Sequence, residues 1–275
     1  MRVGLGWRRE LGASILSHLD EIDVVEVLAE PLFAATPAEK RAFRFLAAHV
    51  PIVVHGTSLG LASTDGVERH RLESLARLME WLEPEAWSEH LAFVRAGGIE
   101  IGHLAAPPRN EETLAALAEN VDAARRTVGA APLLENVATL IEPPCSTYSE
   151  GEWLDVVPRA TGCELLLDLH NLHANAANFG FAIELPRAHV GMVHLAGGRV
   201  IGGDRILDDH LHAVPDVLYE MLGDLDDTTV IIERDGNYPP FEELLAEVRR
   251  ARGGRTLCAP TGMGARGAHA VRPYR

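Results

Sequence analysis

Eight short apolar runs alternate with amphipathic segments along the chain, and this alternation restricts the fold more than any other feature. The runs cover residues 3–7, 24–29, 51–56, 86–93, 132–137, 164–171, 190–197 and 229–235. Nearly continuous apolar strands separated by helices are typical of a parallel sheet that is covered on both faces. Eight such units predict an α/β protein with a closed (β/α)8 TIM barrel. An open, doubly wound sheet is the second possibility, although VGLGWRRE (3–10) lacks the G-x-G-x-x-G spacing of a dinucleotide-binding loop.

The segments between the runs have helical periodicity. Apolar residues recur at spacings of three and four in 37–49, 67–82, 111–128 and 239–251. Thr36, followed by Pro37 and Glu39, predicts the start of a helix.

The chain is expected to form one barrel domain, residues 1–252, with a short tail. From Arg249 to Arg275 there are seven arginines and no acidic residue, and residues 253–275 are rich in Gly, Pro and Arg. Such a segment has too few apolar residues to form a packed core, so we expect a flexible, disordered tail.

Charge and cysteine usage narrow the functional classes. The net charge is −15, whereas a nucleic-acid backbone is normally bound by Lys and Arg, so no nucleic-acid partner is expected. No apolar run reaches the ~18 residues that a membrane-spanning helix needs, and the N-terminus lacks a signal-peptide core. The cysteines Cys145, Cys163 and Cys258 show no CxxC spacing, which is typical of a reduced, cytoplasmic protein.

Polar residues gather at the ends of seven of the eight runs, where a barrel of this type has its active site. Imidazoles and carboxylates without thiolates are ligands for a hard-to-borderline divalent metal. They exceed the three protein ligands of a usual catalytic zinc, so two or three ions with bridging carboxylates would account for them. The set comprises Glu26, Glu30, His55, Glu89, His90, Glu135, Asn136, Asp168, His170, Asn171, His194, Glu233, Arg234 and Asp235, with Asp208, Asp209, His210 and His212 in the loop before the last run.

The stretch LLLDLHNLHANAANFG (165–180) contains the densest group of these residues. Asp168 and Asn171 are spaced to turn two ligands toward one cavity where the strand gives way to a loop. Asp208 and His210 would lie on the same side of an extended segment and share one ion. Asn171, Asn175 and Asn178 could instead satisfy loop backbone groups.

Two further interpretations concern Glu26 and six of the histidines. Glu26 is either an orienting carboxylate behind a ligand or the partner of an arginine. Six other histidines are expected to lie away from the site: His18, His49, His70, His103, His189 and His269.

A series of motifs resembles one enzyme family. The motifs are HGTSLGL (55–61), SEHLAF (88–93), LLENV (133–137), LLDLHNLHANAANFG (166–180), VHLAGG (193–198), DDHLHAVPD (208–216) and ERDGNYPP (233–240). Together they resemble the multinuclear non-haem iron-dependent oxidative enzymes, which include the methanobactin biosynthesis enzyme, over residues 3–250. The resemblance implies a (β/α)8 barrel with two or three irons (Fe2+ or Fe3+). It also implies that dioxygen is used to oxidise cysteine or other residues of a ribosomally made precursor peptide, usually beside a small leader-peptide-binding partner.

Individual residues can be given candidate roles, of which the metal ligands are those that the resemblance implies. Arg234, Asp235 and His212 are the candidates for catalytic or substrate contacts. The implied metal ligands are His55, His90, Glu135, Asp168, Asn171, His194, Asp208, His210 and Glu233.

Three positions mark the chain as a divergent member. The family often has Asn at the position of His170, a second His at that of Gly198, and a polar residue at that of Leu211, so one metal position or the handling of substrate would differ here. His170 or His212 could compensate for the change.

Two other functional classes remain open. One is a metal-dependent hydrolase or sugar isomerase on a barrel like that of xylose isomerase or endonuclease IV, which would use zinc, magnesium or manganese and no dioxygen. The motif order is also similar to the trinuclear zinc barrel of endonuclease IV, but the acidic body argues against a role in DNA repair. The other class is a binding or scaffold protein with a degenerate site.

Overall fold

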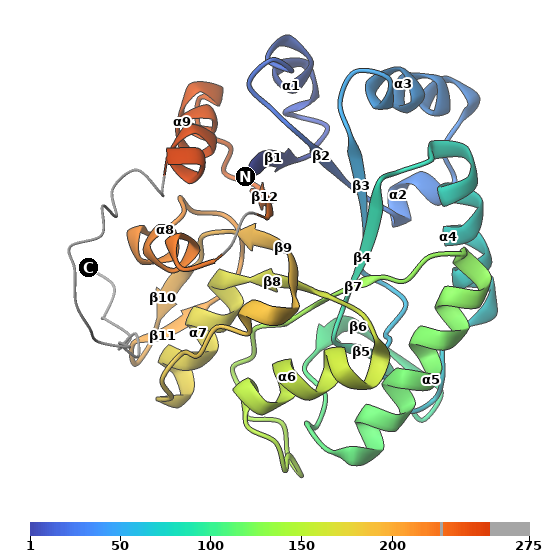
Figure 1. Cartoon of the computed structure of the whole chain (residues 1–275), viewed down its shortest axis with the longest axis vertical. Helices are drawn as coiled ribbons and strands as arrows, with labels where there is room; N and C mark the ends of the chain where they lie inside the picture. The colour runs from blue at the N-terminus through green and yellow to red at the C-terminus, as the bar shows by residue number, and fades with distance from the viewer. Residues whose placement is uncertain (226–227, 254–275) are drawn as a thin grey trace.

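The structure is a computed structural model that describes residues 1–225 and 228–253. Strands occupy the middle of the molecule and most of the helices surround them (Figure 1). The expected tail, 253–275, lies outside the described residues except for Gly253, the last residue of α9. Among the described helices, none is long and apolar enough to cross a membrane.

Eight parallel strands form a closed barrel, which confirms the predicted (β/α)8 fold. The order around the barrel is β1-β12-β9-β8-β7-β4-β3-β2. Barrel strands that are consecutive along the chain are therefore neighbours, and the first strand pairs with the last. The barrel strands are β1 (Arg2–Gly6), β2 (Val25–Leu28), β3 (Ile52–Gly56), β4 (Ala86–His90), β7 (Leu133–Glu135), β8 (Leu165–Asp168), β9 (Val190–Leu195) and β12 (Thr229–Ile232).

Each barrel strand is followed by at least one helix. The helices are α1 (Gly12–Ser17), α2 (Glu30–Phe33), α3 (Pro37–Ala47), α4 (Arg69–Leu82), α5 (Glu111–Val128), α6 (Glu150–Thr161), α7 (Leu169–Phe179), α8 (Asp216–Gly223) and α9 (Phe241–Gly253), with a 3-10 turn at Arg187–His189. The predicted start of α3 is confirmed, because Thr36 and Glu39 form a capping box in which each side chain bonds to the backbone N–H of the other.

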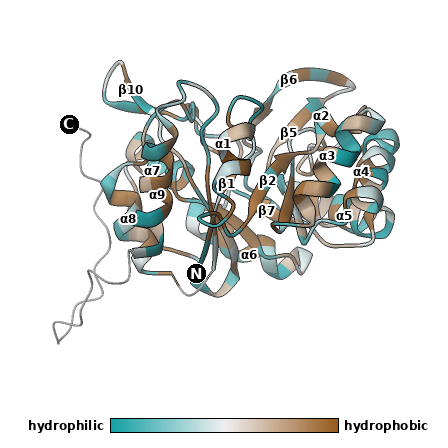
Figure 2. Ribbon diagram, turned by 90° about the horizontal axis from the view of Figure 1, so that it is seen from above, coloured by the Kyte–Doolittle hydropathy of each residue, from teal (hydrophilic) through white to brown (hydrophobic). Residues whose placement is uncertain are grey.

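Two hairpins that periodicity did not predict interrupt the barrel pattern. β5 (Phe93–Ala96) and β6 (Ile99–Ala105) lie between β4 and α5, and β10 (Arg199–Ile201) and β11 (Arg205–Leu207) lie between β9 and α8. Both hairpins therefore follow the carboxyl end of a barrel strand, and they project on the side away from the N-terminus (Figure 2). With the long 136–149 connection, they build up the face where a barrel carries its active site.

The barrel interior has an apolar layer followed by a polar layer. One cluster of buried side chains comes from four strands and from the residue that precedes β2: Val53, Leu166, Met192, Ile231 and Val24. Side chains two positions further along a strand point to the same side, and these are Glu26, His55, Asp168, His194 and Glu233, all buried. The strands thus direct five polar groups into the interior of the barrel, one level above its apolar layer.

The strand predicted for 164–171 ends earlier than expected. β8 stops at Asp168, and α7 begins at Leu169 without an intervening loop. Asp168 is the N-cap of α7, and its Oδ1 accepts a hydrogen bond of 2.7 Å from the backbone N–H of Asn171. An aspartate that satisfies a free N–H favours a helix start, so the prediction of a loop at this point was wrong. His170 and Asn171 lie in the first turn of the helix.

Candidate metal centre

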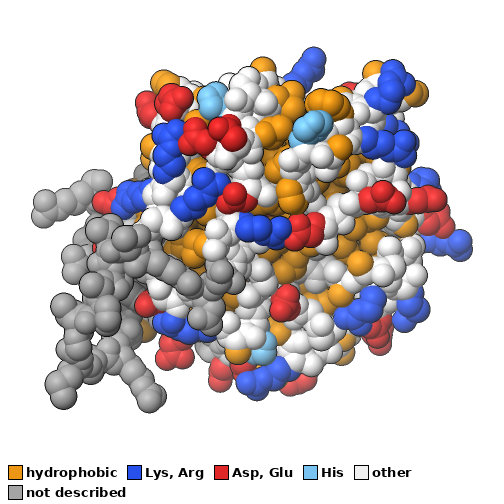
Figure 3. Space-filling model, turned by 45° about the horizontal axis from the view of Figure 1, so that its top comes forward, with side chains coloured by type: hydrophobic (Ala, Val, Ile, Leu, Met, Phe, Trp, Pro, Cys, Tyr) orange, Lys and Arg blue, Asp and Glu red, His pale blue; other side chains and the backbone are white. Residues whose placement is uncertain are grey.

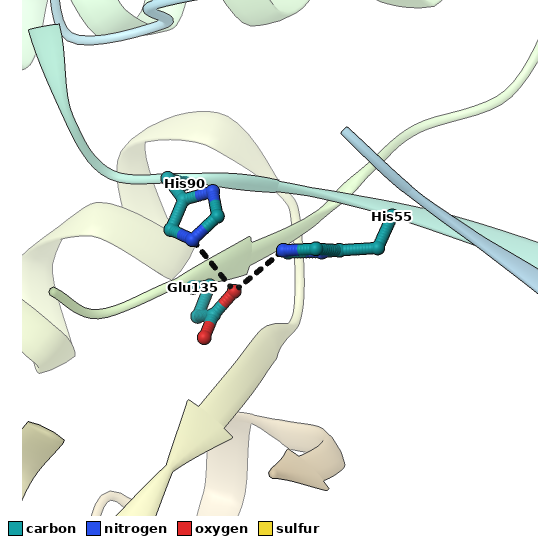
Figure 4. Close-up of side chains that lie close together, drawn as sticks. All are labelled: His55, His90 and Glu135. Atoms are coloured by element: carbon teal, nitrogen blue, oxygen red, sulfur yellow. Dashed lines mark ion pairs between the residues drawn. The ribbon is translucent and has the colours of Figure 1, made fainter. Parts of the chain in front are cut away.

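Three strand ends bring His55, His90 and Glu135 together (Figure 4). Oε2 of Glu135 lies 3.2 Å from Nε2 of His55 and 3.3 Å from Nε2 of His90. The other ring nitrogens face second partners, since Nδ1 of His55 is 2.8 Å from Oγ of Ser88 and Nδ1 of His90 is 3.2 Å from the carbonyl oxygen of Gly56. These partners orient both Nε2 atoms toward one point beside Glu135, as outer hydrogen bonds do for metal-binding histidines.

A second cluster joins Glu135 to Asp168, His194 and Glu233. Nδ1 of His194 lies 3.2 Å from Oε1 of Glu135 and 3.0 Å from Oε2 of Glu233. Nε2 of the same ring lies 2.8 Å from Oε2 of Glu26, which is fully buried. Glu26 therefore lies behind His194, in the place of the orienting carboxylate that the sequence suggested.

A third cluster consists of His210, Glu233 and Asp235. Nδ1 of His210 lies 3.3 Å from both Oε2 of Glu233 and Oδ2 of Asp235. Nε2 of His210 lies 2.9 Å from Oδ1 of Asp208, so these two side chains are in contact, while their sharing of one ion stays a prediction. The clusters are connected, because Glu135 belongs to the first and second and Glu233 to the second and third.

Arg8 is a site residue that sequence reasoning missed. Its guanidinium pairs with Asp235 and lies 3.4 Å from Glu233. Arg8 follows β1, whose inward positions Gly4 and Gly6 carry no polar group. A search for metal ligands at the strand ends therefore finds none on this strand. The signal that could have identified Arg8 is a basic residue just after a strand, at the face where the other strands carry carboxylates.

Several buried polar atoms at the clusters have no hydrogen-bond partner among the described residues. Two of them are Oδ2 of Asp168 and Oδ1 of Asn171. Burying such atoms without a partner is costly, and buried charges are normally paired or bound to a metal. The amide nitrogen of Asn171 donates to the carbonyl oxygen of Asn136 at 2.9 Å, which leaves the side-chain oxygen as the available ligand atom. This set of imidazole, carboxylate and amide donors fits divalent metal ions.

The pKa values show how the metal-free clusters balance their charge. Burial lowers the pKa of His90, but the negative charge of Glu135 outweighs it with the help of Glu89 and raises that pKa to about 9. The pKa values of His194 and His210 are also raised by neighbouring carboxylates, Glu233 foremost, against the effect of burial. Burial and the charges of Asp208 and Glu135 raise the pKa of Asp168 well above its usual value. The raised pKa values of His90, His194 and His210 favour their protonated forms, whose charge offsets that of the neighbouring carboxylates.

We expect metal binding to release protons at neutral pH. A histidine must lose its proton to bind a metal, so the affinity of the metal-free protein for a divalent ion should rise as the pH approaches about 9, the pKa of His90. Titration calorimetry in buffers of different ionisation enthalpy measures the protons released. His103→Gln is the control, because His103 lines the cleft beside the clusters but belongs to none of them. Binding enthalpies that are independent of the buffer would contradict this expectation.

The structure leaves two of the predicted catalytic residues outside the clusters. The guanidinium of Arg234 is buried and lies 3.3 Å from the carboxylate of Glu247 in α9. The side chain of His212 is 43% exposed and lies 3.7 Å from Asp209. Of the three candidates, the structure brings only Asp235 into one of the clusters.

Two asparagines of α7 hold loops in place, which supports the alternative reading of these residues. Oδ1 of Asn175 accepts from the backbone N–H of Thr139 at 2.8 Å, and its amide nitrogen donates to the carbonyl oxygen of Val137 at 2.9 Å. Asn178 makes the equivalent pair of bonds, of 2.8 and 3.0 Å, to the backbone of Ile206 in β11. Two segments of this face, residues 137–139 and β11, are therefore held to α7 by hydrogen bonds.

A cleft of about 460 Å³ opens beside the clusters. His90, Glu135, Asn171, Asp208 and His210 contribute to it, and so does His103, which had been expected to lie elsewhere. The remaining lining is almost entirely apolar and comes from residues 104–106, 137–141, 143–144 and 206–207; among the described lining residues none is Lys or Arg. Elsewhere on the surface, on the face that Figure 3 shows, basic and acidic side chains are interspersed.

Comparison with known proteins gives a match along almost the whole chain. Residues 2–255 match the model of the RiPP precursor modification enzyme family MbnB/TglH/ChrH, whose substrates are ribosomally made precursor peptides. A UPF0276 protein of Streptomyces avermitilis is 38% identical over 261 residues, which are 89% of this chain and 53% of the relative. The chain thus spans about half the length of that relative. A UPF0276 protein of Rhizorhabdus wittichii is 32% identical over 84% of this chain and 86% of its own length.

Solved structures show the same fold at low identity. D-psicose 3-epimerase from Clostridium cellulolyticum H10 has a TM-score of 0.58 at 13% identity and covers 93% of this chain and 97% of its own. A xylose isomerase domain containing protein of Salmonella typhimurium has a TM-score of 0.53 at 16% identity, over 93% and 94% of the two chains. At such identities the likeness shows the barrel fold and nothing of the reaction.

Proposed function

Because this chain belongs to the RiPP precursor modification enzyme family, we propose that it is a multinuclear iron-dependent oxidative enzyme. It would use dioxygen to modify residues of a ribosomally synthesised precursor peptide, with cysteine as the first candidate. The observation that carries this proposal is the sharing of Glu135 and Glu233 between adjoining clusters. Carboxylates that face two clusters at once are suited to bridge neighbouring ions.

The first two proposed ligand sets follow the clusters, and the third shares His210 with the third cluster. His55, His90 and Glu135 would hold one ion, and Glu135, Asp168, His194 and Glu233 a second. Asn171, Asp208 and His210 would contribute to a third. When bound, the iron ions would supply redox equivalents and a site at which a substrate donor and dioxygen are activated. The protein would keep the ligands rigid and charge-balanced, with Arg8 and Asp235 beside the third set.

The cleft favours a peptide over a free sugar. A sugar needs hydrogen-bond partners for its several hydroxyls, and a sugar phosphate needs a cation or helix N-terminus for its phosphate. The cleft walls offer mainly apolar side chains, and the described lining contains no Lys or Arg. An uncharged peptide segment can fill such a cleft and exclude water from the ligands at its floor. We further propose that a small partner protein binds the leader part of the peptide.

A charge in the cleft wall should weaken peptide binding without removing metal. Leu140→Asp places a carboxylate in the wall, where the described lining residues include no Lys or Arg to pair with it. We expect KM for the peptide to rise at least about tenfold, which corresponds to about 1.4 kcal/mol, while the metal content stays unchanged. Steady-state kinetics and elemental analysis measure the two effects. Leu140→Met is the matched control, and an unchanged KM in Leu140→Asp would show that the substrate does not contact this wall.

One experiment tests the function itself. The protein is produced with iron supplementation and purified anaerobically, with a short cysteine-rich peptide and a small leader-binding protein if adjacent genes encode them. Elemental analysis should find two or three irons per chain, and mass spectrometry should find a peptide mass change only when dioxygen is admitted. Stoichiometric zinc without iron, or turnover without dioxygen, would overturn the proposal in favour of a metal-dependent hydrolase or isomerase.

A further inference from the structure

The imidazole of His170 fills the space that a side chain at position 198 would occupy. A Cβ atom added to Gly198 would lie 2.5 Å from Cε1 and 2.8 Å from Nε2 of His170, and 2.1 Å from the carbonyl oxygen of Leu207. Carbon atoms without a covalent bond do not approach so closely. His170 is fully buried, so its ring has this place only because residue 198 is a glycine.

From this place, the ring contacts a proposed metal ligand. Nδ1 of His170 lies 2.9 Å from Oδ1 of Asp208, and Nε2 of His210 lies 2.9 Å from the same oxygen. His170 belongs to none of the three clusters. It therefore contacts the proposed ligand set through Asp208, and this contact comes from α7.

Asp208 needs such a contact because its own segment is irregular. It directly follows β11, and the residues from Asp208 to Pro215 form no helix or strand. β11 is attached to α7 by the two bonds between Asn178 and Ile206. His170 lies in the first turn of the same helix, and it makes the corresponding contact with the side chain of Asp208.

We propose that His170 is a positioning residue, which donates from Nδ1 to Asp208 and so holds that carboxylate for the third ion in the space provided by Gly198. The inference rests on the proposed metal centre. An outer partner that orients a ligand typically contributes 10–100-fold to metal affinity, so its loss should be measurable in metal binding as well as in activity.

Two amide substitutions separate the roles of the two ring nitrogens. The amide nitrogen of asparagine can take the place of Nδ1, whereas that of glutamine reaches the place of Nε2. We compare the full-length wild-type protein with His170→Asn, His170→Gln and His170→Ala, each loaded anaerobically with Fe2+ alone and titrated for bound iron. The wild type and His170→Asn should bind equal amounts, and the weakest site should be weakened by at least about tenfold in His170→Gln and His170→Ala.

The opposite pattern would overturn the inference. If His170→Gln retained all iron and His170→Asn lost it, Nε2 would be the functional atom and His170 would itself be a ligand. If His170→Ala bound iron as the wild type does, Asp208 would need no support from His170.

A second measurement uses the metal-free protein, so that it does not depend on the proposed function. Hydrogen exchange of residues 207–212 should be faster in His170→Gln and His170→Ala than in the wild type, and unchanged in His170→Asn. Equal exchange in all four proteins would refute the positioning role. If the wild type bound no iron, the proposed metal centre would fail, and the exchange rates would still decide whether His170 holds this segment.

Discussion

Replacing Glu135 with alanine is expected to abolish activity and to remove more metal than any other single change at the site. Glu135 is the only carboxylate that the described residues place in both the first and the second cluster. Its two oxygens face different rings, since Oε2 lies between His55 and His90 and Oε1 lies 3.2 Å from His194. Without it, two ions would lose a ligand each and three imidazoles would lose their shared negative partner. Elemental analysis of the anaerobically loaded protein and peptide turnover measure the loss.

Two controls separate this effect from misfolding and from a change of net charge. Glu135→Gln has nearly the same shape but no charge, so it should keep the fold and still lose metal. Asp155→Ala removes one negative charge from α6, where the side chain pairs with Arg159 and belongs to none of the clusters, and should leave the metal content unchanged. Full activity of Glu135→Ala would contradict the proposed metal centre.

Replacing Asp168 with asparagine is expected to lower metal content and activity while it stabilises the metal-free protein. The pKa of the Asp168 carboxyl is raised well above its usual value, by burial first and then by the charges of Asp208 and Glu135. The ionised carboxylate is therefore unfavourable in the metal-free fold at neutral pH, and this cost falls as the pH falls and the group is protonated. A neutral amide avoids the cost, so Tm should rise by about 2–4 °C for each 1 kcal/mol gained. Calorimetry of the metal-free protein and elemental analysis of the loaded protein measure the two effects.

Asp168→Ala is the matched variant, because it removes the helix cap as well as the charge. Oδ1 of Asp168 caps α7 through the backbone N–H of Asn171, and loss of such a cap costs about 1 kcal/mol. Asparagine can keep this bond and alanine cannot, so Asp168→Ala should be the less stable of the two. If Asp168→Asn bound metal as the wild type does, its oxygen would have only the capping role.

The local parts of the fold could be predicted because short-range periodicity encodes them. All eight barrel strands lie at the predicted apolar runs, α5 spans the predicted 111–128, and Thr36 begins α3 as its spacing with Glu39 indicates. The two hairpins were missed because they are short and lie at the surface, where Ile99 and Ile101 of β6 are exposed rather than packed in a core. A period-two pattern is least informative where neither face is buried.

The candidate site could be predicted in its composition but not in its geometry. The barrel fold places the ends of all its strands at one face, so His55, His90, Glu135, His194 and Glu233 could be grouped from the sequence alone. The direction of each side chain could not. Arg234 directly follows Glu233, yet neighbouring residues of an extended chain point to opposite sides, and Arg234 faces α9 while Glu233 faces the ligands.

The sequence by itself determined the barrel, the face that carries the polar groups and the chemical class of their donors, because strand and helix periods and residue types are local properties. The tertiary structure alone decided which groups meet. It brought Arg8 to Asp235 across 227 positions of sequence, made Asp168 a helix cap, and put the ring of His170 in the space at Gly198. These contacts depend on barrel closure, strand register and the volume left free by a missing side chain, which no local pattern contains.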